Sequence, residues 1–193
     1  GRLPDRMLSF FWAEPASEPT IDLRSTEPSD VVDRFRSPAA LLDAQELLLD
    51  GTDLGGAGVG ADALAAAEEA AFQGRLPSLR LLSLSAAGLD ALPPALALRS
   101  LEVLKLECNR LHVLPDALCS RFSRLEQLWV GCNRLAALPS ALGELSRLRE
   151  LWADDNELRT LPQSVGRLRQ LECLSLASNR LGAASAAGAA SAA

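Results

Sequence analysis

Residues 101–118 read LEVLKLECNRLHVLPDAL, and residues 125–142 read LEQLWVGCNRLAALPSAL. The same pattern returns as LRELWADDNELRTLPQSV at 148–165 and as LECLSLASNRL at 171–181, and a weaker copy, LRLLSLSAAGLDALPPAL, lies at 79–96. The copies begin 22, 24, 23 and 23 residues apart. A fixed period of this length indicates structural units that stack on one another. A coiled coil is excluded because the period is not seven and prolines interrupt the repeats.

Each repeat contains a short stretch with the alternation of a β-strand, so its second and third leucine positions point to the same side. These inward pairs are Leu104/Leu106, Leu128/Val130, Leu151/Ala153 and Leu174/Leu176. The asparagine that follows can satisfy backbone groups in the turn and in the next coil, which predicts a ladder of Asn109, Asn133, Asn156 and Asn179. A proline after the next leucine cannot continue a sheet, so there the chain is expected to cross to the opposite side.

The pattern resembles the leucine-rich repeat, L-x-x-L-x-L-x-x-N-x-L, in its 23-residue form, and it covers residues 79–181 in five copies. The stretch LEQLWVGCNRLAALPSALGELSRLRELWADDNEL is similar to the intracellular Ras-group leucine-rich repeat proteins of plants and algae and to the animal Ras-pathway scaffolds of the same class. The resemblance implies an α/β solenoid with a short parallel sheet on its concave side and an irregular or helical convex side. It also implies an intracellular scaffold that binds proteins.

The composition supports a repeat protein over other classes. Forty leucines and 32 alanines stand against seven valines and one isoleucine, which argues against a β-sandwich or barrel. No apolar stretch approaches the ~20 residues that a membrane-spanning helix needs. The net charge of −6 comes from an acidic first third, and the rest is only mildly basic. A nucleic-acid partner is not expected, because it would require a concentrated basic face.

The segments outside the five repeats are harder to assign. Residues 1–43 are expected to form an extended acidic arm that contains prolines, with a short helix beginning at Ser37-Pro38 and reaching about Leu49. Residues 44–78 are either an atypical N-terminal repeat, in which Thr52 takes the asparagine place, or a helical cap. Residues 182–193 form a low-complexity tail of alanine, serine and glycine.

The arm contains a compact apolar cluster whose aromatic members are Phe10, Phe11 and Trp12. Such a cluster in a polar segment is typical of a docking peptide. The alternative is that it folds back over the first coil as a cap. A peripheral membrane contact is not expected, because it requires basic neighbours and only Arg2 and Arg6 are near.

Solvent-facing strand positions of successive repeats form columns on the concave side. The column between the inward leucines reads Ser83, Lys105, Trp129, Trp152 and Ser175, and the next reads Ser85, Glu107, Gly131, Asp154 and Ala177. Two tryptophans on neighbouring strands are the strongest binding signal, because tryptophan is enriched in binding hot spots. We predict a partner-binding patch of Trp129, Trp152, Lys105, Glu107, Arg149, Glu150, Asp154 and Asp155. The alternative is that the two rings only shield each other or are covered by residues 1–37.

Catalysis, cofactors and metals find no support in the sequence. It shows no pairing of a nucleophile with a base, no phosphate-binding glycine loop and no C-x-x-C spacing, and His112 is its only histidine. Cys108 and Cys132 share a column one repeat apart, where a disulfide is conceivable and two semi-buried thiols are the alternative.

The four asparagines form no glycosylation site, which favours an intracellular and cytoplasmic protein. An organelle is the alternative, since the chain begins with Gly1 and a targeting peptide could have been removed.

The sequence thus predicts a non-enzymatic scaffold that binds a protein partner through the concave face and the N-terminal arm. One alternative is an accessory structural subunit held in a large, possibly organellar, assembly. Another is a regulatory or targeting subunit of an enzyme, which would use the same surface.

Overall fold

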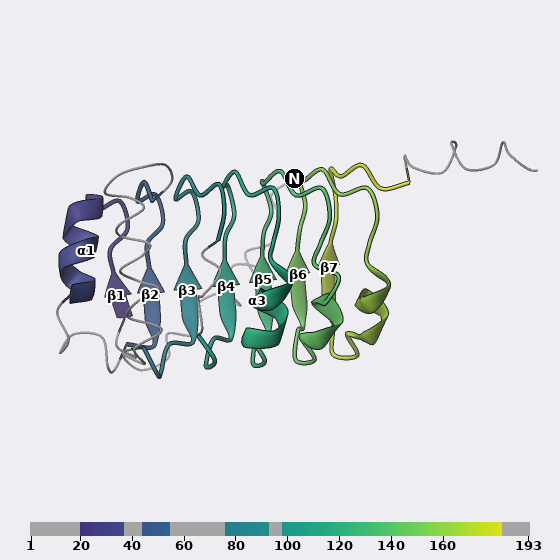
Figure 1. The fold of residues 1–193 in the computed structure, drawn as a ribbon, viewed down its shortest axis with the longest axis horizontal. Coiled ribbons are helices and arrows are strands. Elements are labelled where there is room, and N and C mark those ends of the chain that lie inside the picture. Colours follow the sequence, from purple (N-terminus) through teal and green to yellow (C-terminus); the bar gives the residue numbers. More distant parts are fainter. Residues whose placement is uncertain (1–19, 37–43, 55–75, 93–97, 183–193) are drawn as a thin grey trace, which may run out of the picture.

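The computed structural model describes residues 20–36, 44–54, 76–92 and 98–182. Its strands are three residues long and all parallel: β1 Thr20–Asp22, β2 Glu46–Leu48, β3 Leu81–Ser83, β4 Val103–Lys105, β5 Gln127–Trp129, β6 Glu150–Trp152 and β7 Cys173–Ser175. They lie side by side in the order of the sequence, β1 to β7, in one curved sheet (Figure 1). The predicted parallel solenoid is therefore confirmed over the described ranges, and each coil of it contributes one strand.

Every described strand is followed, three residues after its end, by a residue with a left-handed backbone. These turn residues are Ser25, Gly51, Ala86, Cys108, Cys132, Asp155 and Ser178, with φ between 51° and 70°. The backbone N–H of the turn residue then donates to the next coil, as in the 3.1 Å bond from Cys108 N to the Gly131 carbonyl oxygen. The shared turn keeps the coils in the same register, which is why the columns expected from the sequence are real.

The array begins earlier than the repeat pattern of the sequence predicts. Strand β1 pairs with β2 in the same register as the later strands, with Ile21 opposite Leu47. Helix α1, Pro28–Arg36, follows β1 and lies beside it at the end of the sheet (Figure 1). The expectation of an extended arm is therefore wrong for residues 20–36. A strand needs only one buried side chain here, and the single apolar position of Thr20–Asp22 gives no alternation to detect.

The segment left open between a repeat and a helical cap contains strand β2. Leu47, Leu49 and Leu54 are buried, as the leucine positions of a repeat should be. The helix expected to run from Ser37 to about Leu49 is wrong at its end, because residues 46–48 are a strand. Its first part, residues 37–43, lies outside the described residues, as do residues 55–75 and the tail from 183.

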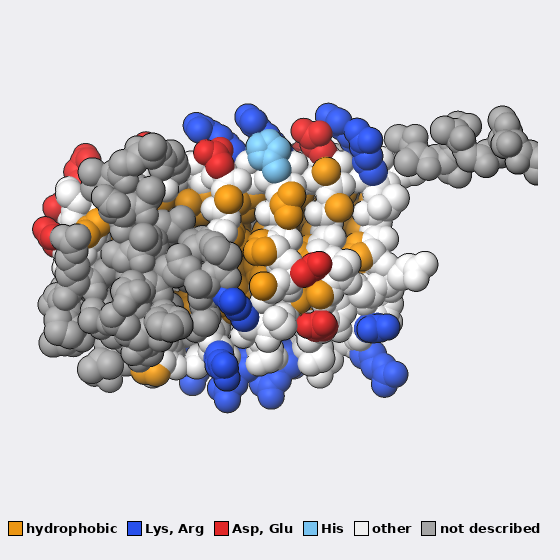
Figure 2. All heavy atoms as spheres, viewed as in Figure 1, with side chains coloured by type: hydrophobic (Ala, Val, Ile, Leu, Met, Phe, Trp, Pro, Cys, Tyr) orange, Lys and Arg blue, Asp and Glu red, His pale blue; other side chains and the backbone are white. Residues whose placement is uncertain are grey.

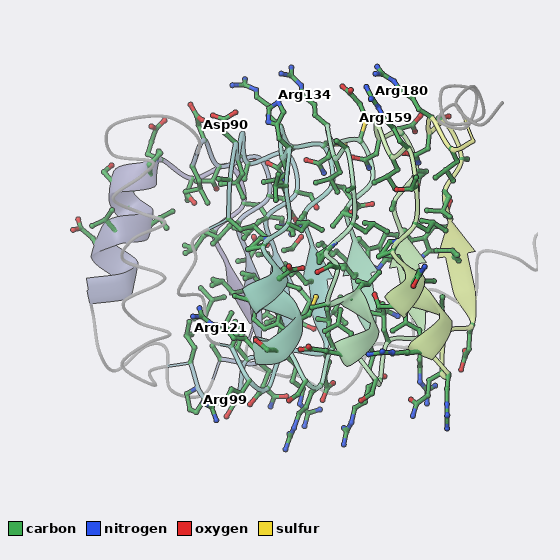
Figure 3. All side chains as sticks on the ribbon, turned by 45° about the vertical axis from the view of Figure 1, so that its right-hand side comes forward. Asp90, Arg99, Arg121, Arg134, Arg159 and Arg180 are labelled. Atoms are coloured by element: carbon green, nitrogen blue, oxygen red, sulfur yellow. The ribbon has the colours of Figure 1, made fainter. Side chains whose placement is uncertain are left out.

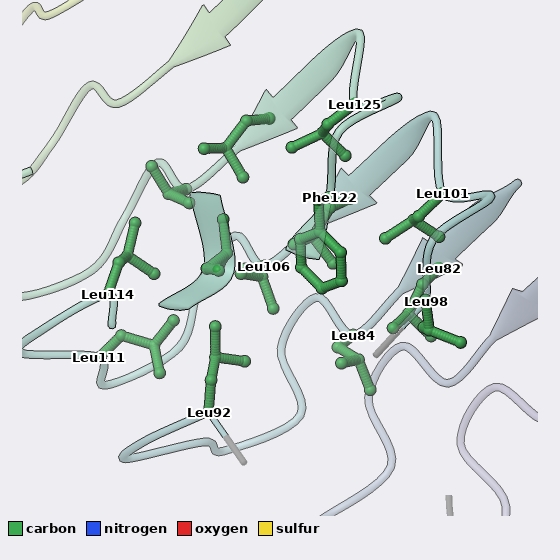
Figure 4. Close-up of a cluster of buried hydrophobic side chains, with 14 of the residues drawn as sticks. Leu82, Leu84, Leu92, Leu98, Leu101, Leu106, Leu111, Leu114, Phe122 and Leu125 are labelled. Carbon is green, nitrogen blue, oxygen red and sulfur yellow. The ribbon is translucent and has the colours of Figure 1, made fainter. Parts of the chain in front are cut away.

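The core is a continuous row of leucines between the sheet and the opposite side of the coils (Figure 4). The inward strand leucines Leu104 and Leu128 are fully buried, and Phe122 fills the space between two coils at 2% exposure. Leu174 of β7 points inward as predicted but is 40% exposed, since no further strand covers it in the described part of the chain. No coil could bury its leucines alone, so stability comes from stacking.

The asparagine ladder forms as predicted, with one difference in direction. The amide of Asn109 donates to the Leu84 carbonyl oxygen at 2.8 Å, and its Oδ1 accepts from the Leu89 N–H at 2.9 Å. Both partners belong to the preceding coil, not the next one. Asn133, Asn156 and Asn179 repeat the arrangement. Asn109, Asn133 and Asn156 are buried at 6–8% exposure, so each ties two coils together from inside the core.

Leucine-proline pairs lead to short helices opposite the sheet, as expected. Helix α3, Asp116–Arg121, begins directly after Pro115, and the 3₁₀ helix η3, Gln163–Arg167, begins directly after Pro162. Between them lies the 3₁₀ helix η2, Leu142–Glu144. Figure 3 shows this second row of helices in front of the strands, which leaves the other face of the sheet as a separate surface.

Candidate functional site

The two concave tryptophans lie directly beside each other. Trp129 and Trp152 are register partners on β5 and β6, and their rings stack with centroids 5.1 Å apart and planes 23° from parallel. Lys105, the register partner of Trp129 on β4, places its Nζ 5.5 Å from the centroid of the Trp129 ring. Lys105, Trp129 and Trp152 form what we call the tryptophan stack, in which a cation–π contact adds to the ring contact.

Glu150 holds the Trp152 ring of the stack in place. Its Oε2 accepts a 2.9 Å hydrogen bond from Nε1 of Trp152, two residues along the same strand. Its Oε1 accepts a 3.0 Å bond from Nε2 of Gln127 on the neighbouring strand. Holding a ring in place before binding lowers the entropy lost when a partner arrives. Gln127 was not among the predicted residues, although its place in the column of Glu150 is visible from the repeat spacing.

Two further carboxylates lie at the end of the stack where the strands turn. The Asp154 carboxylate lies close to Gly131. A Cβ added to that glycine would be 3.4 Å from each of the two carboxylate oxygens. Glu107 occupies the same column on the other side of Gly131 and accepts a long, 3.4 Å hydrogen bond from the Ser85 hydroxyl. Burial raises the pKa of Glu107; Lys105 and the Ser85 bond oppose the rise, and Asp154 adds to it. Glu107 and Asp154 thus put concentrated negative charge beside an aromatic surface.

The tryptophans are less exposed than two side chains pointing freely to solvent would be. Both are half-buried, and each ring covers part of the other. The Nε1 of Trp129 is buried and has no hydrogen-bond partner among the described residues, unlike that of Trp152. Mutual shielding, the alternative interpretation of the pair, is therefore part of the arrangement. The remaining surface still combines an aromatic face, a cation and three carboxylates.

Two of the predicted site residues lie apart from the stack. Arg149 is exposed at the edge where the chain enters the strands, and it forms ion pairs with Glu126 at 3.9 Å and Glu172 at 3.6 Å. It bridges three successive coils there. Asp155 is the exposed turn residue of its coil, at the opposite edge. Phe10, Phe11 and Trp12 lie outside the described residues.

Charged side chains gather along both edges of the array and are sparse between them in the view of Figure 2. Figure 3 shows Arg134, Arg159 and Arg180 in a row along one edge, with Asp90 at its end. Ion pairs at the edges join neighbouring coils, as between Arg180 and Glu157 at 3.1 Å. Exposed pairs of this kind contribute about 0–1 kcal/mol each, so they solubilise the edges more than they hold the fold.

The repeated coils and the parallel sheet match one known family over part of the chain. Residues 99–158 match the leucine rich repeat family. Leucine-rich repeats are typically non-enzymatic modules, and they generally mediate protein–protein interaction. A comparison with curated proteins finds no match.

Solved structures share the fold. A leucine-rich repeat protein of Leptospira interrogans is 24% identical, with a TM-score of 0.59 over 80% of this chain and 41% of its own. An internalin C2 from Listeria monocytogenes is 26% identical, with a TM-score of 0.58 over 72% of this chain and 54% of its own. The leucine-rich repeat ectodomain of a plant membrane receptor kinase from Arabidopsis thaliana, solved in complex with CASPARIAN STRIP INTEGRITY FACTOR 2, is 27% identical, with a TM-score of 0.57 over 74% of this chain and 16% of its own. The present chain therefore covers between 16% and 54% of the length of these three proteins.

Metal-ligand clusters and membrane-spanning helices are the other two features that bear on function. No three or more histidine, cysteine, aspartate or glutamate side chains gather in the described ranges as metal ligands would. Among the helices of those ranges, none combines the length and the hydropathy that crossing a membrane requires. Within the described residues, the tryptophan stack and its carboxylates therefore form the best-defined candidate site.

Proposed function

We propose that this chain is a scaffold that binds a protein partner on the concave face of its sheet, with the tryptophan stack as the centre of the contact. The observation that carries the proposal is the stack itself. The rings of Trp129 and Trp152 stack with their centroids 5.1 Å apart, and they lie outside the core that the leucines build. Tryptophan anchors of this kind contribute much of the binding energy of protein interfaces.

The charges around the stack indicate the chemistry of the partner. Three carboxylates surround the stack, those of Glu107, Glu150 and Asp154, whereas the stack itself contains one cation, Lys105. A partner segment that brings an apolar or aromatic side chain to the rings and a basic side chain to the carboxylates would complement this surface. The ectodomain from Arabidopsis thaliana, a solenoid of similar fold, was solved in complex with CASPARIAN STRIP INTEGRITY FACTOR 2, which supports a binding role for this kind of array.

The proposal is tested by comparing what the parent and a Trp129→Ala/Trp152→Ala variant recover from an extract of the source cells. Quantitative mass spectrometry of the recovered proteins should show at least one partner reduced tenfold or more by the double substitution. Val113→Ala is the matched control, because Val113 is an apolar side chain that is 67% exposed and lies away from the stack. Circular dichroism of each variant checks that the solenoid is intact.

A second variant tests the same surface without truncating a ring. Asp154→Lys reverses one charge beside the rings while every core leucine stays in place. It should weaken capture of the same partner and reduce the dependence of capture on salt. Recovery of an unchanged set of proteins by both the double variant and Asp154→Lys would refute the concave site.

The N-terminal part of the proposal needs a deletion that spares the array. Residues 20–36 supply β1 and α1, so removing them would expose β2 and confuse binding with folding. Deleting residues 1–19 removes the predicted docking cluster of Phe10, Phe11 and Trp12 and leaves the first coil. Loss of the partner with unchanged thermal stability would assign binding to that segment, and unchanged recovery would confine binding to the concave face.

A further inference from the structure

Two of the four cysteines lie side by side at the turn edge of the sheet. Cys108 and Cys132 are the turn residues of successive coils, three residues beyond the register partners Lys105 and Trp129. Their backbones have nearly the same conformation, with φ of 55° and 57°. The Cys108 N–H donates to the carbonyl oxygen of Gly131, the residue directly before Cys132, at 3.1 Å. Their Cα–Cβ bonds therefore leave neighbouring coils in the same direction.

Strands of a sheet lie about 4.8 Å apart, which falls inside the Cα separation that a disulfide bond accepts. Both side chains are exposed, so the predicted pair of semi-buried thiols is wrong on that point. Partial burial of the sulfur raises the pKa of the Cys108 thiol, and a hydrogen bond with Cys132 raises it further. The two thiols thus face each other across the coils.

We propose that Cys108 and Cys132 form a reversible disulfide that joins the coils of β4 and β5. The oxidant is a small-molecule disulfide of the glutathione class. One protein thiolate attacks a sulfur of glutathione disulfide, whose S–S bond breaks as one glutathione leaves. The second protein thiolate then attacks the cysteine sulfur of that mixed disulfide and expels the other glutathione, so the protein S–S bond forms as the S–S bond to glutathione breaks. The protein gives up two electrons and two protons, and the glutathione disulfide becomes two glutathione molecules.

The other two cysteines provide internal controls. Cys119 is fully buried on α3, and burial raises the pKa of its thiol to about 12, so it should not react. Cys173 is half-buried on β7, and its register partner is Glu150. It should form at most a mixed disulfide, without a partner thiol to complete the exchange.

The bond would act on the part of the chain that carries the tryptophan stack. Cys108 follows Glu107, and Cys132 lies three residues after Trp129. A cross-link between these turns closes a loop of one repeat and restrains the column of Glu107, Gly131 and Asp154. It should raise the thermal midpoint of unfolding, since a closed loop reduces the entropy of the unfolded chain.

The experiment incubates the full folded chain with glutathione disulfide, then unfolds it in guanidinium chloride and blocks the remaining thiols with iodoacetamide. Intact mass should show the loss of two hydrogens, with Cys119 alkylated and Cys173 either alkylated or carrying one glutathione. Tryptic digestion should give a linked pair of the peptides 106–110 and 125–134, which contain Cys108 and Cys132. Dithiothreitol should separate them. The rate of bond formation should rise with pH, because the raised pKa of Cys108 limits its thiolate.

Single-serine variants separate this reaction from general thiol oxidation. Cys108→Ser and Cys132→Ser should each stop as a stable glutathione adduct on the remaining turn cysteine, because the second displacement has lost its nucleophile. Cys173→Ser should behave like the parent. If the parent keeps four alkylatable cysteines, accumulates a glutathione adduct on Cys108 or Cys132, or links a different pair, the proposal is wrong.

Discussion

The hydroxyl of Thr52 donates a hydrogen bond to the Leu23 carbonyl oxygen, 3.0 Å away. The amide of Asn109 makes the equivalent bond to the Leu84 carbonyl oxygen at 2.8 Å. Thr26 donates to the same Leu23 oxygen from within its own coil. In the first two coils threonine hydroxyls thus take over the donor role that the asparagine ladder fills later in the array.

Thr52→Val should lower the free energy of unfolding by about 1 kcal/mol, because the valine keeps the volume and loses a buried hydrogen bond. Urea denaturation followed by circular dichroism measures the change. Thr160→Val is the control, since Thr160 is exposed and its substitution should leave the midpoint unchanged. Equal effects of the two substitutions would show that the hydroxyl of Thr52 does not connect the coils.

Asn133→Ala should be far more destabilising than Asn179→Ala. Asn133 is buried, and its loss leaves the buried Leu111 N–H without its partner and removes one of the two donors to the Leu106 carbonyl oxygen, which keeps only Asn109, at a cost of about 3 kcal/mol. Asn179 makes the same bonds in the last described coil but is half-buried, so water can replace it and the cost should be about 1 kcal/mol. Similar denaturation midpoints for the two variants would contradict the position dependence.

Ala86→Gly should stabilise the protein by up to about 1 kcal/mol. Ala86 is exposed with φ of 54°, a conformation in which a Cβ is strained and glycine is not. The neighbouring Ala87→Gly is the control with the opposite sign, because Ala87 is fully buried and its methyl group packs in the core. Thermal unfolding measures both, and a lower midpoint for Ala86→Gly would rule out relief of turn strain.

Glu107→Gln should gain stability over the parent at neutral pH. Burial raises the pKa of Glu107 in the folded state, so ionisation of this side chain above that pKa favours unfolding. The gain should shrink as the pH falls through the raised folded pKa, and it should vanish below the ordinary value of a glutamate. Denaturant midpoints of both proteins across this pH range give the difference. A gain that is constant with pH would have another cause.

The sequence is sufficient for the array from Leu79 onward because leucine, asparagine and proline recur there at fixed places. It is insufficient for the first coil, where Ile21, Leu23 and Thr26 occupy the same places without a leucine pattern. A threonine at the asparagine place is compatible with many structures, and only its bond to the Leu23 oxygen shows its role. The turn residue carries no signature either, since cysteine, alanine, serine and aspartate all occupy it.

For the candidate site, the columns follow from the repeat spacing alone. The contacts within them do not, because they depend on side-chain rotamers. Spacing places Glu150 beside the tryptophans, but its bonds to Trp152 and Gln127 depend on which way the carboxylate turns. Arg149 illustrates the reverse, since it flanks the same strand yet its guanidinium extends along the edge to Glu126 and Glu172.

The strict succession of strands, in which each pairs only with the one before and the one after, governs how the molecule comes apart. A coil is held by two neighbours in the middle of the array and by one at a described end. Opening should therefore propagate inward from β7, where Leu174 is 40% exposed, and backbone amides of β4 and β5 should exchange with solvent last. The tryptophan stack spans β4 to β6 and so is carried largely by the slowest-opening coils, which would preserve a binding surface while the ends fray.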